Sequence, residues 1–312
     1  MKILLDNVNL GSSSGPNHFG SKLIRYLEPL GIQCITDDAP SDIQLSFIET
    51  HKVKVEIPLI LRMDGIYFDV DTDYIQKNKN ILRTYKMAAG VVFQSEYSKE
   101  LIFKHFGNHS NYEIIHNGAD LKQIESAPKL DSHIFGNHGD IWSCASSWYY
   151  NNNPATPRRF KRLGENIEFF LKYSKPADCF VVAGDVPPQD RHRDDRIHYV
   201  GRLERRALFS LYKASKYFVH LCSPDSCPNV IIDARAAGCK IVCSSMGGSK
   251  EIAGPDAIIV EEESWDYAPM RLNAPRRIDL TNITANCYNT EISMTHVAQR
   301  YEAFLRNFTQ CR

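Results

Sequence analysis

Short apolar strands that alternate with helical stretches are the feature that most constrains the fold of this chain. A strand-like segment at 2–9 is followed by a loop at 11–16 and by apolar residues at helical spacing up to Gly31. The alternation continues, with further strands predicted at 43–48, 57–61, 91–93 and 112–115 and helices at 74–88 and 96–105. Such repeated strand–helix units are typical of a parallel sheet with right-handed crossovers.

A second alternating series begins at Asp140, after a polar, irregular stretch at 119–139 that we interpret as a linker. Its strands are predicted at 141–145, 179–183, 197–200, 217–220, 240–243 and 257–260, and its helices at 162–172, 204–214, 228–237 and after Gly248. The chain of 312 residues therefore predicts an α/β protein with two doubly wound, Rossmann-like domains. We expect them at 1–125 and 138–293, with a closing helix at about 294–312 that packs back on the first domain.

Composition and sequence patterns limit which binding partners and which cellular compartment are expected. Basic and acidic residues balance at 37 each, so no nucleic-acid partner is expected. The N-terminus does not resemble a signal peptide, and no apolar run approaches the roughly 18 residues of a membrane span. Together with nine scattered cysteines, these two observations predict a cytoplasmic protein with reduced thiols. The basic segments 191–196 and 202–206 are interpreted as solvated surface, with membrane contact as the open alternative.

The stretch 223–252 carries the residues most informative about function. Asp225 precedes a predicted helix, and Asp233 lies eight residues later, about two turns along. Pro228 stands in the first turn, where a missing amide hydrogen is harmless. The free amides of a helix N-terminus and its dipole favour anions. This stretch therefore predicts an anion site with two carboxylates within its reach.

The same stretch resembles the signature of glycosyltransferase family 4. That signature has two acidic residues separated by seven others, a CPN-V setting and a following Gly-Gly-x-x-Glu; here Asp225 and Asp233 have that spacing, with CPNV at 227–230 and GGSKE at 247–251. Other segments resemble the family in the same order: GPNHF at 15–19, FQSEYSK at 93–99, IIHNGAD at 114–120, VAGD at 182–185 and YVG at 199–201. The resemblance covers nearly all of the chain up to about residue 262.

The resemblance implies a GT-B fold, in which two Rossmann-like domains face each other across a cleft. It implies a hexosyltransferase-type enzyme that moves a sugar from a nucleotide-diphosphate donor to a hydroxyl of a glycan or other acceptor. Retention of the anomeric configuration and independence from metal are part of that expectation. A UDP- or GDP-sugar is the expected donor, and no other cofactor is expected.

The resemblance also assigns residues to the donor. Catalytic roles fall to Asp225, which would contact the donor sugar, and to Lys161, which would grip the diphosphate. The family places an arginine upstream of that lysine; Trp148 stands near its position, so Arg158 or Arg159 would substitute. The backbone at 200–202 would frame the base, and Asp233 would bind the ribose. The full donor-binding set is Arg158, Arg159, Val200, Gly201, Arg202, Pro228, Asn229, Val230 and Asp233.

On the acceptor side, Asp64 follows a predicted strand. It is expected either to orient the acceptor hydroxyl as a catalytic residue or to cap a turn. The resemblance implies that the cleft on this side is lined by Gly15, Pro16, Ser95 and Asn117.

Two metal sites are alternatives from the residues alone. Cys222, Cys227, Cys239 and Cys243 cluster in sequence near His220, but the chain has no CxxC pair to support zinc. The DVDTD run at 69–73 is compatible with a divalent cation, but it precedes a helix, where acidic residues are favoured structurally. Neither site is expected to hold a metal.

Rival functions remain open beside glycosyl transfer. The family has Glu where this chain has Asp225 and Asp233, and its arginine is displaced, which would suit a nucleotide-sugar or glycan binder without catalysis. A GT-B epimerase that acts on the nucleotide sugar is a second alternative. A nicotinamide dehydrogenase is disfavoured because no glycine fingerprint is present.

Overall fold

The computed structural model describes residues 1–12, 15–37, 39–54, 56–136, 139–150, 153 and 155–309. It divides into two units, each with its own sheet. Unit 1 comprises Met1–Gly118, Asp266–Met270 and Glu291–Arg312, and unit 2 comprises Ala119–Trp265 and Arg271–Thr290. The two doubly wound α/β sheets expected from the sequence are confirmed.

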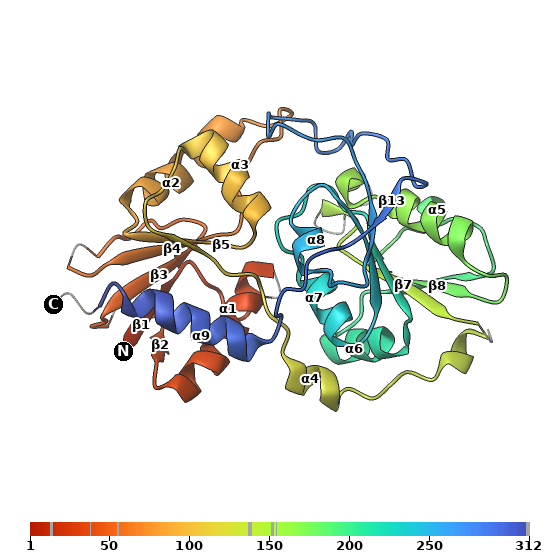
Figure 1. Cartoon of the computed structure of the whole chain (residues 1–312), viewed down its shortest axis with the longest axis horizontal. Helices are drawn as coiled ribbons and strands as arrows, with labels where there is room; N and C mark the ends of the chain where they lie inside the picture. Colours follow the sequence, from red (N-terminus) through yellow and green to blue (C-terminus); the bar gives the residue numbers. More distant parts are fainter. Residues whose placement is uncertain are drawn as a thin grey trace. The chain divides into compact units, whose positions relative to one another are not determined.

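Unit 1 contains a sheet of six described strands in the order β2-β1-β3-β4-β5-β6, and every neighbouring pair is parallel. Figure 1 shows α2 and α3 on one side of this sheet and α1 and α9 on the other. The elements are β1 (Lys2–Asp6), α1 (Gly15–Leu27), η1 (Glu28–Leu30), β2 (Gln33–Ile35), β3 (Ile43–Phe47), β4 (Leu59–Met63), α2 (Tyr74–Met87), β5 (Gly90–Phe93), α3 (Glu96–Phe106), β6 (Tyr112–Ile114) and α9 (Met294–Arg306).

The C-terminal helix α9 completes the core of unit 1. Its Tyr301 is fully buried and lies 5.9 Å from Phe19 of α1, measured between ring centroids. Burial of one large apolar side chain contributes about 1.5–3 kcal/mol. Gly118 shows how close the packing is, because a Cβ there would lie 2.9 Å from atoms of Met294 and Val297. The last helix therefore folds as part of the first sheet's unit.

Unit 2 contains a sheet of seven described strands in the order β13-β12-β11-β10-β7-β8-β9, parallel except for β13. The elements are α4 (Leu121–Ser126), η2 (Ser132–Phe135), β7 (Ile141–Ala145), η4 (Arg159–Lys161), α5 (Leu163–Tyr173), β8 (Cys179–Ala183), η5 (Pro188–Asp190), β9 (Ile197–Gly201), α6 (Arg205–Ala214), β10 (Tyr217–His220), α7 (Asn229–Ala236), β11 (Lys240–Ser244), α8 (Ser249–Ile252), β12 (Ile258–Val260) and β13 (Ile283–Ala285).

Side chains of successive strand residues in unit 2 alternate between two helical layers. Trp142 of β7 packs edge-on against Phe170 of α5, and Phe218 of β10 packs edge-on against Tyr212 of α6. Both faces of the sheet are therefore covered, which explains why its strands read as nearly continuous apolar runs.

The strand order fixes where ligands are expected in unit 2. Its first three strands run outward as β7-β8-β9, and the fourth, β10, lies on the other side of β7. The order of connection reverses between β7 and β10. In doubly wound sheets, ligands bind beyond the carboxyl ends of the strands at this reversal. The corresponding reversal in unit 1 lies between β1 and β3.

Several element boundaries differ from the sequence expectation. The first strand ends at Asp6 rather than residue 9, because Asn7 has a left-handed backbone with φ of 58°. The strand expected at 57–61 occupies Leu59–Met63, since the Ile57 amide closes a turn onto the Lys54 carbonyl. The predicted linker contains the short helix α4, which Asp120 caps. Among the described residues, no helix is long and apolar enough for a membrane span.

Candidate functional site

Two charged residues predicted to act on the donor meet at the strand-order reversal of unit 2. Lys161 ends η4 in the connection that follows β7, and Asp225 lies in the connection between β10 and α7. Lys161 Nζ lies 3.0 Å from Asp225 Oδ2, although the residues are 64 positions apart in sequence. The carboxyl ends of two neighbouring parallel strands bring them together.

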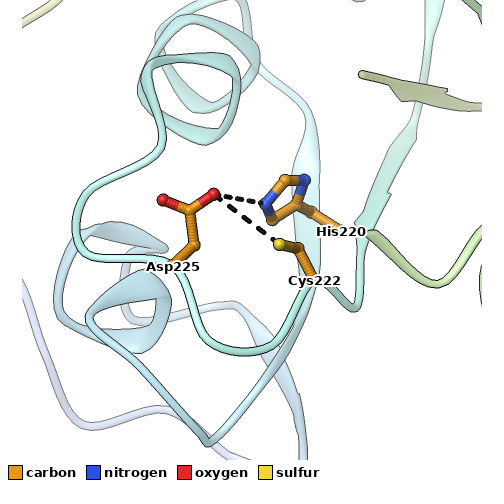
Figure 2. A group of neighbouring side chains, drawn as sticks. All are labelled: His220, Cys222 and Asp225. Atoms are coloured by element: carbon orange, nitrogen blue, oxygen red, sulfur yellow. Dashed lines mark hydrogen bonds and ion pairs between the residues drawn. The ribbon is translucent and has the colours of Figure 1, made fainter. Parts of the chain in front are cut away.

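His220 and Cys222 complete this cluster, as Figure 2 shows. One oxygen of the Asp225 carboxylate faces both of them: Oδ2 is 3.7 Å from His220 Nε2 and 3.7 Å from Cys222 Sγ. The sequence alone indicates both residues only as candidate zinc ligands. Their link to Asp225 follows from the turn after β10, which folds residue 225 back over the end of its strand.

Electrostatics keeps the Lys161–Asp225 pair charged. Burial alone would raise the pKa of Asp225, but Lys161 and His220 hold that pKa well below its usual range. Burial alone would lower the pKa of Lys161, but Asp225 holds it above its usual value. Burial lowers the pKa of His220, and burial raises the pKa of the Cys222 thiol to about 12. Near neutral pH the cluster therefore contains one cation, one anion, a neutral imidazole and a thiol.

Glycines of the GGSKE motif hold the backbone of Asp225. Gly247 has φ of 106°, and a Cβ there would lie 2.6 Å from the Asp225 carbonyl oxygen. The amide of Gly248 donates to that same oxygen at 2.8 Å. The first glycine is therefore needed for close backbone approach and left-handed conformation, which gives the motif a physical role in placing the carboxylate.

Arg162 anchors the segment that carries Lys161. Its side chain is buried and pairs with both carboxylate oxygens of Glu262, at 2.7 and 2.8 Å. Its backbone is left-handed, with φ of 54°, which is uncommon for a residue with a Cβ. The bidentate pair compensates a charge that is expensive to bury. This arginine holds the turn between η4 and α5.

The predicted residues of α7 are arranged around its N-terminus. Pro228 is the N-cap and Asn229 and Val230 are the first helical residues, so the amides of these two residues have no partner within the helix. Asn229 Oδ1 is buried and has no hydrogen-bond partner among the described residues. Asp233 is buried one turn further along. This helix end offers donors and one acceptor to a ligand.

The predicted base-framing residues end β9. Gly201 has φ of 68°, and its carbonyl accepts a hydrogen bond from the amide of Gly184 at 2.7 Å. The amide of Arg202 donates to Asp185 Oδ1 at 3.2 Å. Val200 lies on the side of this strand end that faces α6, in an apolar pocket with Leu203 and Leu211. The backbone at 200–202 is thus fixed by the turn after β8.

Arg158 and Arg159 lie elsewhere in unit 2. Both line a pocket of about 420 Å³, of which neither Lys161 nor Asp225 is a lining residue. The Arg158 guanidinium stacks over the Tyr150 ring at 4.5 Å. The structure therefore brings Lys161 to Asp225 but does not bring the predicted substitute arginines into that pair.

The predicted residues of unit 1 form a polar network at the ends of β4 and β5. Asp64 Oδ1 accepts hydrogen bonds from Arg62 and Gln94. Arg62 also donates to Asn117 Oδ1 at 2.7 Å, and Asn117 donates to Gln94 at 3.1 Å. Asp64 Oδ2 is buried with no hydrogen-bond partner among the described residues. Sequence reasoning missed Arg62, whose signal is a charged residue inside a buried strand.

The remaining acceptor-side candidates lie at helix starts. Gly15 and Pro16 open α1, and Ser95 caps α3 by accepting a hydrogen bond from the Ser98 amide at 3.0 Å. Ser95 is fully buried, so its hydroxyl has a structural role.

The structure bears differently on the two alternative metal sites. Within the described ranges, the one group of three potential ligands is His220, Cys222 and Asp225; Cys227, Cys239 and Cys243 are outside it. The Asp225 oxygen of that group already pairs with an ammonium. In the DVDTD run, Asp73 caps α2 and Asp69 accepts the Asp71 amide, both structural roles.

The chain resembles known proteins in part of its sequence and in its fold. Residues 160–268 match the family model Glycosyl transferases group 1. That segment includes Lys161, Asp225 and the whole of α7. A comparison with curated proteins finds no match.

Solved structures with a similar fold cover nearly the whole chain. HepE of Anabaena in complex with UDP-glucose has a TM-score of 0.66 at 13% identity, covering 98% of this chain and 100% of that one. A glycosyltransferase from Rickettsia africae has a TM-score of 0.62 at 13% identity, covering 100% and 99%. Sucrose-phosphate synthase from Thermosynechococcus elongatus has 0.58 at 13%, covering 99% and 92%. The fold is GT-B.

Proposed function

We propose that this protein is a glycosyltransferase that moves a sugar from a nucleoside-diphosphate donor to a hydroxyl of an acceptor. The observation that carries the proposal is the Lys161–Asp225 pair, which lies at the strand-order reversal of unit 2 and inside the segment matched by the family model. The solved HepE structure of the same fold contains UDP-glucose. Retention and independence from metal are carried over from the family 4 resemblance.

Lys161 would stabilise the leaving group. In the transfer, the bond from the anomeric carbon to the diphosphate breaks and negative charge accumulates on the diphosphate oxygens. The raised pKa of Lys161 keeps its ammonium charged, so it can offset that charge. The pair with Asp225 holds the ammonium in place before the donor arrives.

Residues of α7 and its preceding turn would hold the donor. The first-turn amides at Asn229 and Val230 would bind phosphate oxygens, as helix N-termini do. The unpartnered Oδ1 of Asn229 would accept a donor hydroxyl, and the buried carboxylate of Asp233 would accept the ribose hydroxyls. Asp225, which stays ionised, would lie next to the donor sugar and offset positive charge at its anomeric carbon.

Asp64 would orient the acceptor. Its Oδ1 is fixed by two donors from neighbouring strands, which leaves Oδ2 as an acceptor without a partner among the described residues. A hydrogen bond from an acceptor hydroxyl to Oδ2 would fix the orientation of that hydroxyl group. This role belongs to unit 1, and donor binding belongs to unit 2.

Thermal unfolding with nucleoside diphosphates tests the proposal. UDP, GDP, ADP, dTDP and NAD are added singly, with and without a divalent cation. A ligand at about 100 times its Kd adds roughly 2.7 kcal/mol, which moves the midpoint by several degrees for a chain of this size. We expect a shift with UDP or GDP that does not require metal, and transfer from the matching nucleotide sugar.

Other outcomes would replace the proposal. A shift that requires metal would contradict independence from metal, and a shift with NAD alone would indicate an oxidoreductase. Nucleotide binding without transfer or hydrolysis would indicate a binding protein. Conversion of the nucleotide sugar without an acceptor would indicate an epimerase.

A further inference from the structure

The pocket lined by Arg158 and Arg159 lies in unit 2, next to the start of α5. Its volume of about 420 Å³ is within the usual range for small-molecule sites. Three chain segments form it: the connection after β7, the first turn of α5, and residues 273–275. The residues used below are Trp148, Arg158, Arg159, Arg162, Glu165 and Asn273.

Positive charge dominates the lining. The charge of Arg162 is compensated by Glu262, and Glu165 is the carboxylate among the lining residues. Arg158 stacks on Tyr150 rather than pairing with a carboxylate in any contact of the described residues. Arg159 is exposed to solvent. The surplus favours a ligand with an oxyanion, because guanidinium groups bind carboxylate and phosphate in bidentate fashion.

The pocket residues also have buried polar atoms without partners among the described residues. These atoms are Nε of Arg158, Nε of Arg162 and Oδ1 of Asn273. Arg162 is 2% exposed, so its Nε–H cannot be satisfied by bulk water. Unpartnered buried polar atoms are unfavourable and uncommon. Two donors and one acceptor match a ligand that combines an oxyanion with hydroxyl groups.

The pocket is separate from the Lys161–Asp225 pair. Arg159 and Lys161 are two residues apart in η4, and side chains two apart in a 3-10 helix point in directions about 120° apart. Accordingly Arg159 lines the pocket, and Lys161 contacts Asp225. One turn of helix thus serves two sites.

We propose that this pocket binds a small anionic sugar, a sugar phosphate or a sugar carboxylate, as a second ligand of unit 2. The oxyanion lies against Arg158 and Arg159, and the hydroxyl groups reach Asn273 and Glu165. Trp148 forms part of the wall against which the sugar rests. The site does not depend on the proposed transferase activity.

Calorimetric titration of the full chain tests the site, with glucose 6-phosphate, glucuronate, glucose and inorganic phosphate as separate ligands. We expect at least one of the two anionic sugars to bind, more tightly than glucose or phosphate. The tighter of the two identifies phosphate or carboxylate as the recognised group. Arg159→Ala should weaken binding at least tenfold and Asn273→Ala several-fold, whereas Arg193→Ala, an exposed arginine outside the pocket, should leave it unchanged.

Four results would overturn the proposal. The first is that neither anionic sugar binds. The second is that Arg159→Ala binds as tightly as the unmodified chain, and the third is that inorganic phosphate binds as tightly as the sugars. The fourth is competitive displacement by UDP, which would assign the ligand to the Lys161–Asp225 site. Circular dichroism of each variant checks that it is folded, and Arg159 is exposed enough for its removal to leave the fold intact.

Discussion

In unit 1 the Arg62 guanidinium bonds Asp64 and Asn117 and lies over the rings of Phe19 and Phe47, whereas in unit 2 the Lys161 ammonium pairs with Asp225. The arginine side chain is 1% exposed. The lysine and its carboxylate partner are 16% and 22% exposed. The Arg62 cation is enclosed by its own protein, and the Lys161 cation lies where a ligand can reach it. A buried cation therefore indicates a ligand site only when its partner can be exchanged.

The largest effect should come from Arg62→Met. The substitution removes the guanidinium that bonds both Asp64 and Asn117 and removes two cation–π contacts. Breaking a buried ion pair from one side costs about 3–5 kcal/mol. Urea denaturation measures the change, and Lys79→Met, on an exposed residue of α2, should stay within about 0.5 kcal/mol of the unmodified chain. If the two variants were equally stable, the Arg62 pair would contribute nothing to folding, and the contrast between an enclosed cation in unit 1 and an accessible one in unit 2 would be wrong.

Lys161→Met should act on turnover. Loss of a group that stabilises developing negative charge lowers kcat about 100-fold, equivalent to about 2.7 kcal/mol. Its effect on stability should be smaller than that of Arg62→Met, because the pair is partly exposed. Steady-state transfer assays measure turnover, with Lys172→Met, on an exposed residue of α5, as the control. Full activity of Lys161→Met would disprove the diphosphate role.

Asp225→Asn should lower turnover at least tenfold. Asparagine keeps the shape of the side chain but removes the charge that would steady the anomeric carbon. The same assay tests it, at donor concentrations that separate kcat from KM. A rise in KM with unchanged kcat would mean that Asp225 only binds the donor.

The smallest effect should appear in the pH dependence of His220→Gln. The folded-state pKa of His220 is lowered by burial, so on acidification the unfolded chain takes up the proton first. Stability contributed by the neutral ring is present above about pH 6.5 and is lost as the pH falls below it, by at most about 1.4 kcal/mol per pH unit. Thermal unfolding from pH 7.5 to 5 should show a shallower loss in His220→Gln. An unchanged slope would place the acid sensitivity elsewhere.

The sequence predicted most strands and helices of both units because their signals are local. Helical spacing and apolar runs located α1, α5, α7 and β7 to β11 within a few residues. Edge strands β2 and β13 and helix α4 have three to six residues each, too few for a periodic pattern to emerge. Strand β12 is equally short but was predicted, because its Ile-Ile-Val sequence is an apolar run; a short element is missed when it has no such run.

The candidate site could be predicted in part. Asp225 and Lys161 came from the family resemblance, and no periodicity could have paired residues 64 positions apart. His220 lies within a strand, so only the topology shows that it faces Asp225. The surroundings of Arg158 include Tyr150 of the connection after β7, which no local pattern could have placed there. Local patterns locate residues, but the strand order decides which of them meet.

The Arg162–Glu262 pair has an evolutionary consequence. A glycine at position 162 would adopt the left-handed backbone without strain but would leave Glu262 buried without its cation. A neutral residue at position 262 would leave the Arg162 guanidinium buried without its carboxylate partner. Either replacement made alone would therefore give a protein of lower stability. Among related sequences these two positions should therefore change together: arginine should be accompanied by an acidic residue at 262, and glycine should free that position to vary.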